Sequence, residues 1–174
     1  MNRKTLLLVL AGVLMCLLTG LVWKFNQKSE LQAQVSQQIQ SIPPLTLATL
    51  QGENIPIQAY AAGQPFLLIY FNSTCDICKI TLNALNARIE EFDQVAILLV
   101  SNQLREELES VLVDYPFLSQ YNVQLVIDEE MHLSTYLGVR SVPSIFCYDG
   151  VGSLAASYQG PVKLDILLDK LVNR

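Results

Sequence analysis

A continuous apolar run that leads into a close pair of cysteines restricts the fold of this chain more than any other feature. The run, residues 66–71, lies between Pro65 and Asn72, as is typical of a strand buried on both faces. Cys75 and Cys78 follow within a few residues, at the start of a segment with helical spacing of its apolar residues. At this spacing both sulfurs lie on one side of the first helical turn, close enough to bond.

The rest of the chain continues the alternation of strands and helices. Further strands are expected over 45–49, 55–58, 95–100, 123–127, 144–148 and 153–158. Helices are expected over 75–92, 104–115, 129–137 and 162–172, the first with an apolar stripe of Ile77, Ile80, Leu82, Leu85 and Ile89. We expect residues 128–130 to begin the third helix, stabilised by its dipole. The predicted class is α/β, with a central mixed sheet that a terminal hairpin extends by antiparallel strands and that helices flank.

The N-terminal residues predict a membrane anchor. No charged residue occurs over 5–23, and such a helix would be about 28 Å long, close to the thickness of the hydrocarbon core. Arg3 and Lys4 precede the run and favour a cytoplasmic tip over 1–4, with the remainder outside the cytoplasm. A cleaved signal peptide would have an A-x-A-like triplet before its cleavage site, and none occurs near Thr19. A lipoprotein would have a small residue directly before its acylated cysteine, and the residue before Cys16 is not small. An uncleaved transmembrane signal-anchor over 5–23 is therefore expected.

A glutamine-rich segment separates the anchor from the globular part. We expect a stalk over 24–41, ended by Pro43 and Pro44, and a folded domain over 42–174. All 16 acidic residues of the chain follow Ser29, together with only seven of its 11 basic ones. This acidic surface argues against nucleic acid or anionic lipid as a partner of the domain.

The two cysteines have different expected roles. Cys75 stands where free backbone N–H groups and the helix dipole stabilise an anion, which lowers the pKa of its thiol and activates it as a nucleophile. Cys78 lies deeper in the helix and is expected to resolve a mixed disulfide. A zinc site would need four ligands, but the chain has no second C-x-x-C and only one histidine, His132. No metal site is therefore expected.

The order of these features resembles that of thioredoxin-like proteins. The strand over 66–71, the loop over 72–74 and the sequence Cys-Asp-Ile-Cys resemble their active-site turn, and residues 138–146 are similar to their cis-proline segment. The stretch 95–116 resembles the insertion of the membrane-anchored TlpA/ResA-type and redoxin (AhpC/TSA-related) branch. The resemblance implies a cis peptide between Val142 and Pro143, with Pro143 beside the sulfurs and the Val142 backbone free to bind substrate.

Several positions depart from the family pattern. Thr74 replaces the usual tryptophan before the first cysteine, and Asp76 and Ile77 replace Gly-Pro. Ile69 stands where thioredoxin carries a buried acid. The Asp76 carboxylate opposes ionisation of the adjacent thiol, and Lys79 partly offsets it.

These features predict a thiol–disulfide oxidoreductase of the bacterial inner membrane, with its domain in the periplasm. The only redox group would be the Cys75–Cys78 disulfide, with no further cofactor. The expected partners are disulfides of exported proteins and a membrane-bound or periplasmic electron donor.

Three alternatives are kept. A peroxiredoxin-type peroxidase would have Thr-x-x-Cys and a nearby arginine, but Asn72 stands at the threonine position. A Sco-type copper protein would have three residues between its cysteines and a histidine, for which only His132 is available. A module with a purely structural disulfide is the third. Cys147, in a predicted strand, is expected to be a buried core thiol.

Overall fold

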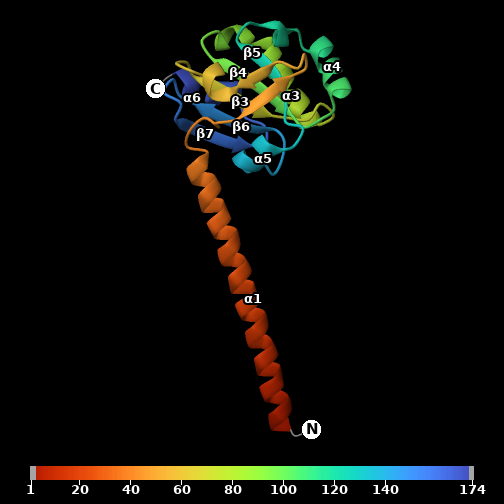
Figure 1. The fold of residues 1–174 in the computed structure, drawn as a ribbon, viewed down its shortest axis with the longest axis vertical. Coiled ribbons are helices and arrows are strands. Elements are labelled where there is room, and N and C mark those ends of the chain that lie inside the picture. The colour runs from red at the N-terminus through yellow and green to blue at the C-terminus, as the bar shows by residue number, and fades with distance from the viewer. Residues whose placement is uncertain (1–2, 173–174) are drawn as a thin grey trace. The chain divides into compact units, whose positions relative to one another are not determined.

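The chain divides into two compact units, residues 1–37 and 38–174, and a computed structural model describes residues 3–172 (Figure 1). The helices are α1 (Arg3–Gln38), α2 (Ile57–Tyr60), α3 (Asp76–Ala87), α4 (Arg105–Asp114), α5 (His132–Leu137) and α6 (Leu164–Val172), with short 3₁₀ helices η1 (Ile89–Phe92) and η2 (Pro116–Ser119). The strands are β1 (Thr46–Thr49), β2 (Asn54–Pro56), β3 (Phe66–Tyr70), β4 (Ala96–Ser101), β5 (Val123–Ile127), β6 (Ser144–Tyr148) and β7 (Leu154–Gln159).

The first unit is helical and belongs to α1, which covers both the predicted anchor and most of the predicted stalk. Residues 1 and 2 of the predicted cytoplasmic tip lie outside the described residues, as do the side chains of 5–11, 13 and 14 in the predicted anchor. Within the part of the chain that is described, no helix is both long and apolar enough to cross a membrane. The anchor over 5–23 stays a prediction.

The second unit begins before residue 42, because residues 38–41 contact the domain. The Tyr136 hydroxyl donates to the carbonyl oxygen of Gln38 at 3.0 Å, and the Gln38 side-chain amide donates to the Tyr136 carbonyl. The N–H of Leu154 donates to the carbonyl of Gln40 at 2.9 Å, and the side chain of Ile42 is buried. These contacts make residues 38–42 part of the second unit.

The second unit contains one seven-stranded mixed sheet, in the order β2-β1-β5-β4-β3-β6-β7. The three central strands β5, β4 and β3 are parallel, and β6 and β7 continue the sheet as an antiparallel hairpin beside β3. On the other side, β1 pairs antiparallel with both β5 and β2. The prediction of an α/β fold with a central mixed sheet flanked by helices is confirmed.

Helices cover both faces of the sheet, which explains why its central strands are continuous apolar runs. In β3, Leu67 and Ile69 belong to a cluster beneath α3, α4 and α6. Phe66, Leu68 and Tyr70 belong to a second cluster, covered by α2 and α5. Successive side chains of a strand point to opposite faces of the sheet. Because helices cover both faces here, neither face of β3 is exposed to solvent, and the strand contains no position that favours a polar residue.

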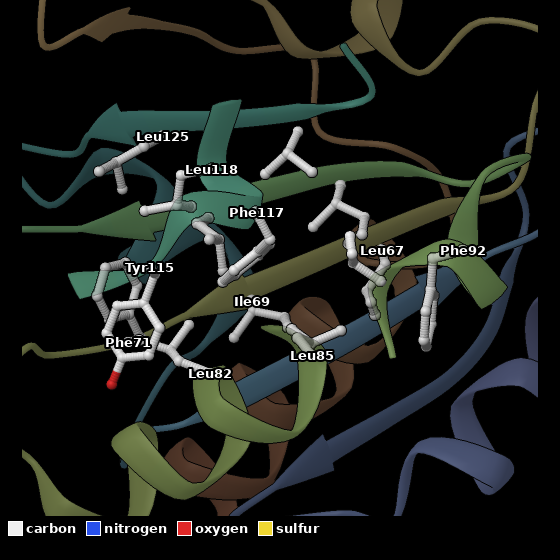
Figure 2. Close-up of a cluster of buried hydrophobic side chains, with 14 of the residues drawn as sticks. Leu67, Ile69, Phe71, Leu82, Leu85, Phe92, Tyr115, Phe117, Leu118 and Leu125 are labelled. Atoms are coloured by element: carbon white, nitrogen blue, oxygen red, sulfur yellow. The ribbon is translucent and has the colours of Figure 1, made fainter. Parts of the chain in front are cut away.

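The first cluster joins the helix that carries the cysteine pair to the centre of the sheet. Figure 2 shows Leu82 and Leu85 of α3 gathered with Leu67 and Ile69 of β3. All four side chains are at most 1% exposed. This packing determines which face of α3 is turned inward.

Some predicted boundaries and one predicted face are wrong. The helix expected over 75–92 ends at Ala87 and is followed by η1. The strand expected over 55–58 ends at Pro56, and α2 follows it. Ile77 and Ile80 were expected in the apolar stripe of α3, but they are 45% and 62% exposed. The inward face instead contains Cys78, Thr81, Leu82 and Leu85.

The buried carboxylate of Asp128 organises the segment after β5. Its Oδ1 accepts a hydrogen bond from the N–H of Leu133 at 3.0 Å, and its Oδ2 accepts one from the N–H of Ser134 at 2.8 Å. Oδ2 also accepts from the hydroxyl of Tyr70 on β3, at 3.0 Å. Asp128 therefore satisfies the first free N–H groups of α5 and joins that helix to the central strand.

Helix α5 begins at His132, three residues later than the sequence predicts. Met131 adopts a left-handed conformation with φ of 54°, which no α-helix accommodates, so Glu129 and Glu130 remain outside the helix. Asp128 stabilises the start of the helix through direct hydrogen bonds.

We predict that Asp128→Ala lowers the free energy of unfolding by about 3 kcal/mol, because it leaves three donors in the protein interior without their acceptor. Urea denaturation of the full-length chain measures the change. Glu129→Ala removes an exposed neighbouring carboxylate and should change the stability by less than about 0.5 kcal/mol. Equal stability of the two variants would show that Asp128 does not have this role.

Candidate functional site

The cysteine pair lies at the carboxyl end of the central strand β3, where the chain turns into α3. Cys75 is the residue before the helix and has an extended backbone (φ −81°, ψ 117°). Its N–H donates to the carbonyl of Asn72 at 3.2 Å, and its own carbonyl accepts the N–H of Lys79 at 3.0 Å, which begins the helical pattern. Cys75 therefore stands beside the free N–H groups of the first helical turn.

A compact turn leads into this position. The side-chain oxygen of Asn72 accepts hydrogen bonds from the N–H of Thr74 at 2.8 Å and from the Thr74 hydroxyl at 2.6 Å. Asparagine side chains commonly stabilise turns in this way. Thr74 is therefore part of the turn that presents Cys75, at the position where the family pattern has tryptophan.

The two cysteines are close together but differ in exposure. Cys75 and Cys78 lie 3.3 Å apart, and both are free thiols in this structure. Cys75 is half-buried, whereas Cys78 is completely buried in the first cluster. An incoming sulfur can therefore reach Cys75 but not Cys78.

The surroundings shift the pKa values of the two thiols in opposite directions. Hydrogen bonds from the backbone N–H and the thiol of Cys78, and from the backbone N–H of Ile77, lower the pKa of Cys75 from its ordinary value, against the effects of burial and of the Asp76 carboxylate. Burial raises the pKa of Cys78 to about 12, helped by its proximity to Cys75. Of the two thiols, Cys75 is therefore the one that ionises more readily.

The predicted cis peptide between Val142 and Pro143 is present, and it lies beside the first cysteine. Strand β6 pairs with β3 so that Ser144 stands opposite Tyr70, which brings the residues before β6 next to the loop after β3. The Cys75 thiol lies 3.9 Å from the carbonyl oxygen of Val142, to which it donates. Among the described residues, none forms a hydrogen bond with the N–H of Val142, and Pro143 is buried.

Gln103, which is not among the predicted site residues, holds the loop before the cysteines in place. It follows β4 and is only 8% exposed. Its Oε1 accepts the N–H of Ser73 at 2.6 Å, and its Nε2 donates to the Ser73 hydroxyl at 2.9 Å and to Glu107 at 2.9 Å. Gln103 could have been found from the sequence, because it is a polar residue just after a predicted buried strand, at the edge of the sheet where the parallel strands end.

The other candidate residues lie apart from this arrangement. Cys147 is fully buried in β6, where burial raises the pKa of its thiol to about 12. His132 is exposed, and its Nε2 lies 3.4 Å from a carboxylate oxygen of Glu130. Ile69, at the position where thioredoxin carries a buried acid, is fully buried in the first cluster. Among the described residues, no group of three or more His, Cys, Asp or Glu is arranged to hold a metal ion.

This thioredoxin-like arrangement agrees with a comparison of the sequence with protein families. Residues 39–157 match the model of the AhpC/TSA family. The chain belongs to the AhpC/TSA family. This confirms the resemblance to the redoxin branch of the thioredoxin-like superfamily. No curated protein sequence gives a significant match.

Solved structures similar to this AhpC/TSA family member share its fold at low sequence identity. A secreted disulfide oxidoreductase of Mycobacterium tuberculosis, homologous to E. coli DsbE, has a TM-score of 0.65 at 16% identity, over 79% of this chain and 98% of its own. The exposed lipoprotein thioredoxin of Streptococcus pneumoniae has a TM-score of 0.59 at 22% identity, over 75% and 98%. StoA from Bacillus subtilis has a TM-score of 0.55 at 21% identity, over 74% and 98%.

We predict that iodoacetamide alkylates Cys75 with a pH midpoint below the ordinary thiol pKa, whereas Cys78 remains unmodified at pH values well below about 12. Asp76→Asn should lower the Cys75 midpoint further, because the carboxylate raises that pKa. Mass spectrometry that distinguishes the cysteines measures both rates. Asp93→Asn, which changes an exposed acid on another segment, is the control. An unchanged or higher midpoint in Asp76→Asn would contradict the assigned effect of the Asp76 carboxylate on the Cys75 pKa.

We predict that Gln103→Ala lowers the hydrogen-exchange protection of the Ser73 amide by about tenfold, because the N–H loses a short hydrogen bond to a buried acceptor. Gln120→Ala, at an exposed glutamine, should leave this protection unchanged. Protection that persists in Gln103→Ala would mean that another contact holds the loop.

Proposed function

We propose that this chain is a membrane-anchored, extracytoplasmic thiol–disulfide oxidoreductase that reduces disulfides of exported proteins. The observation that carries the proposal is the pairing of an accessible thiol of lowered pKa with a buried thiol of raised pKa, 3.3 Å apart and beside a cis-proline. Such an asymmetric pair is suited to disulfide exchange, which needs one sulfur to attack and a second to resolve.

In the first step, the Cys75 thiolate attacks one sulfur of a substrate disulfide. A bond forms between the Cys75 sulfur and that substrate sulfur, the substrate S–S bond breaks, and the other substrate sulfur leaves as a thiolate that takes a proton from water. The free N–H of Val142, at the edge beside Cys75, is available to an extended substrate segment.

In the second step, Cys78 loses its proton and attacks the Cys75 sulfur. The Cys75–Cys78 disulfide forms, and the first substrate sulfur leaves as a thiolate, so that the substrate gains two electrons and the dithiol loses two. Bonding of the Cys75 sulfur to substrate removes the thiolate that helps to raise the Cys78 pKa, which favours ionisation of Cys78 at that stage.

A dithiol donor must then reduce the Cys75–Cys78 disulfide. We assign this step to a membrane-bound or periplasmic electron donor, and the protein to the inner membrane of a bacterium through residues 5–23. Two of the similar structures are those of a secreted oxidoreductase and an exposed lipoprotein thioredoxin, which supports an extracytoplasmic role. In this assignment the redox-active disulfide is the only redox group.

We predict that the reduced full-length chain accelerates the reduction of insulin by dithiothreitol. In Cys75→Ser this acceleration should fall at least about 100-fold, because the attacking sulfur is gone. Cys78→Ser should still attack and accumulate as a mixed disulfide, visible on a non-reducing gel. Cys147→Ala is the matched control and should keep the wild-type rate within about twofold.

The same variants distinguish the alternatives. Consumption of hydrogen peroxide faster than reduction of insulin would favour the peroxidase. Tight binding of Cu(I) that weakens in His132→Ala would favour the copper protein. Activity that survives in Cys75→Ser would contradict the proposed mechanism.

A further inference from the structure

A polar groove lies beside the loop that precedes Cys75, on the flank away from the cis-proline. Its volume is about 570 Å³, and it is formed by the loop residues Ser73 and Thr74 together with side chains of α3 and α4. Helix α4 follows β4, and β4 and β6 lie on opposite sides of β3. Because Pro143 immediately precedes β6, the groove and the cis-proline flank the loop that carries Cys75 from opposite sides.

The two helices contribute matching pairs of residues to the groove. Lys79 and Asn83 lie one turn apart on α3, and Ser110 and Asp114 lie one turn apart on α4. The groove therefore has a cation and an amide on one side, and a hydroxyl and a carboxylate on the other. This combination suits a ligand that carries charges of both signs and peptide groups, and it does not suit an apolar one.

Several of these polar groups are available to a ligand. Among the described residues, neither the Asn83 amide nor the Asp114 carboxylate has a hydrogen bond or an ion pair. Lys79 contacts Asp76 only at 3.7 Å, in an exposed pair of the kind that contributes little. Lys79 can therefore turn toward a bound anion at small cost.

Tyr115 forms a rigid part of the groove. Its ring packs at the edge of the first cluster, and Figure 2 shows its hydroxyl pointing away from that cluster. Burial and the neighbouring Asp114 carboxylate raise the pKa of Tyr115, so its hydroxyl remains a hydrogen-bond donor. Val111, only 3% exposed, lies one turn before Tyr115 and adds an apolar contact to the groove.

We propose that this groove binds the polar, charged peptide segment next to the reacting cysteine of a substrate, and so makes the dithiol prefer peptide disulfides to small uncharged disulfides. The proposal rests on the thiol–disulfide exchange proposed above. Thr74, the residue directly before Cys75, lines the groove, so the groove is next to the segment that carries the reacting sulfur. Its volume lies within the range of small-ligand sites.

The test compares two disulfides as substrates of the reduced full-length chain. Glutathione disulfide carries carboxylates, ammonium groups and peptide bonds, whereas 2-hydroxyethyl disulfide carries no charge. The double variant Lys79→Ala/Asp114→Ala removes one charge of each sign and so leaves the net charge unchanged. We expect it to lower the ratio of kcat/KM for glutathione disulfide over 2-hydroxyethyl disulfide about tenfold.

Lys170→Ala/Asp169→Ala is the matched control, because it also removes an exposed pair of opposite charges, on α6 away from the groove. It should leave the ratio at the wild-type value. Asn83→Leu is a second groove variant and should lower the ratio as well, by about threefold.

The outcomes separate the two proposals. A wild-type chain that reduces neither disulfide would overturn the proposed function itself. A chain that reduces both, with the same ratio in the wild type and in the groove variants, would overturn only the groove as a peptide site. Circular dichroism of each variant shows that a lowered ratio comes from a folded protein.

Discussion

Burial of strand β3 on both faces is the constraint on which the site depends. Its five residues are at most 3% exposed, and the strand pairs with β4 on one side and with β6 on the other. Since β6 runs antiparallel, its first residue stands opposite the last residue of β3, and the cis-proline meets the loop that begins α3. A strand held this firmly gives Cys75 a defined position relative to the Val142 carbonyl, although the two residues are far apart in the sequence.

Polar side chains at the carboxyl ends of the parallel strands organise the loops around that position. Asn72, after β3, forms the turn that presents Cys75. Gln103, after β4, binds the backbone and side chain of Ser73. Asp128, after β5, binds the start of α5 and reaches Tyr70 of β3. The bonds to Gln103 and Asp128 satisfy donors that burial would otherwise leave unpaired, so the loops at this edge are held by hydrogen bonds as well as by packing.

The chemistry of the cysteine pair follows from a difference in depth. One sulfur lies at the start of α3, where free backbone N–H groups stabilise an anion, and the other lies one turn later within the apolar cluster. The same helix therefore lowers one pKa and raises the other. Burial is the largest cause of the raised Cys78 pKa, and the Cys75 sulfur is the ionisable group that adds to it.

The sequence by itself determined the α/β class, the approximate positions of the central strands, the cysteine pair at a helix start and, through the family resemblance, the cis peptide before Pro143. These are readable because apolar runs and cysteine spacing are local properties of the chain. Only the tertiary structure decided that Ile77 and Ile80 face outward, that α5 starts after the left-handed Met131, that Gln103 holds Ser73, and that a polar groove lies between α3 and α4. Each of these depends on which strands and helices become neighbours, and that neighbourhood is determined by pairing and packing between residues distant in the sequence.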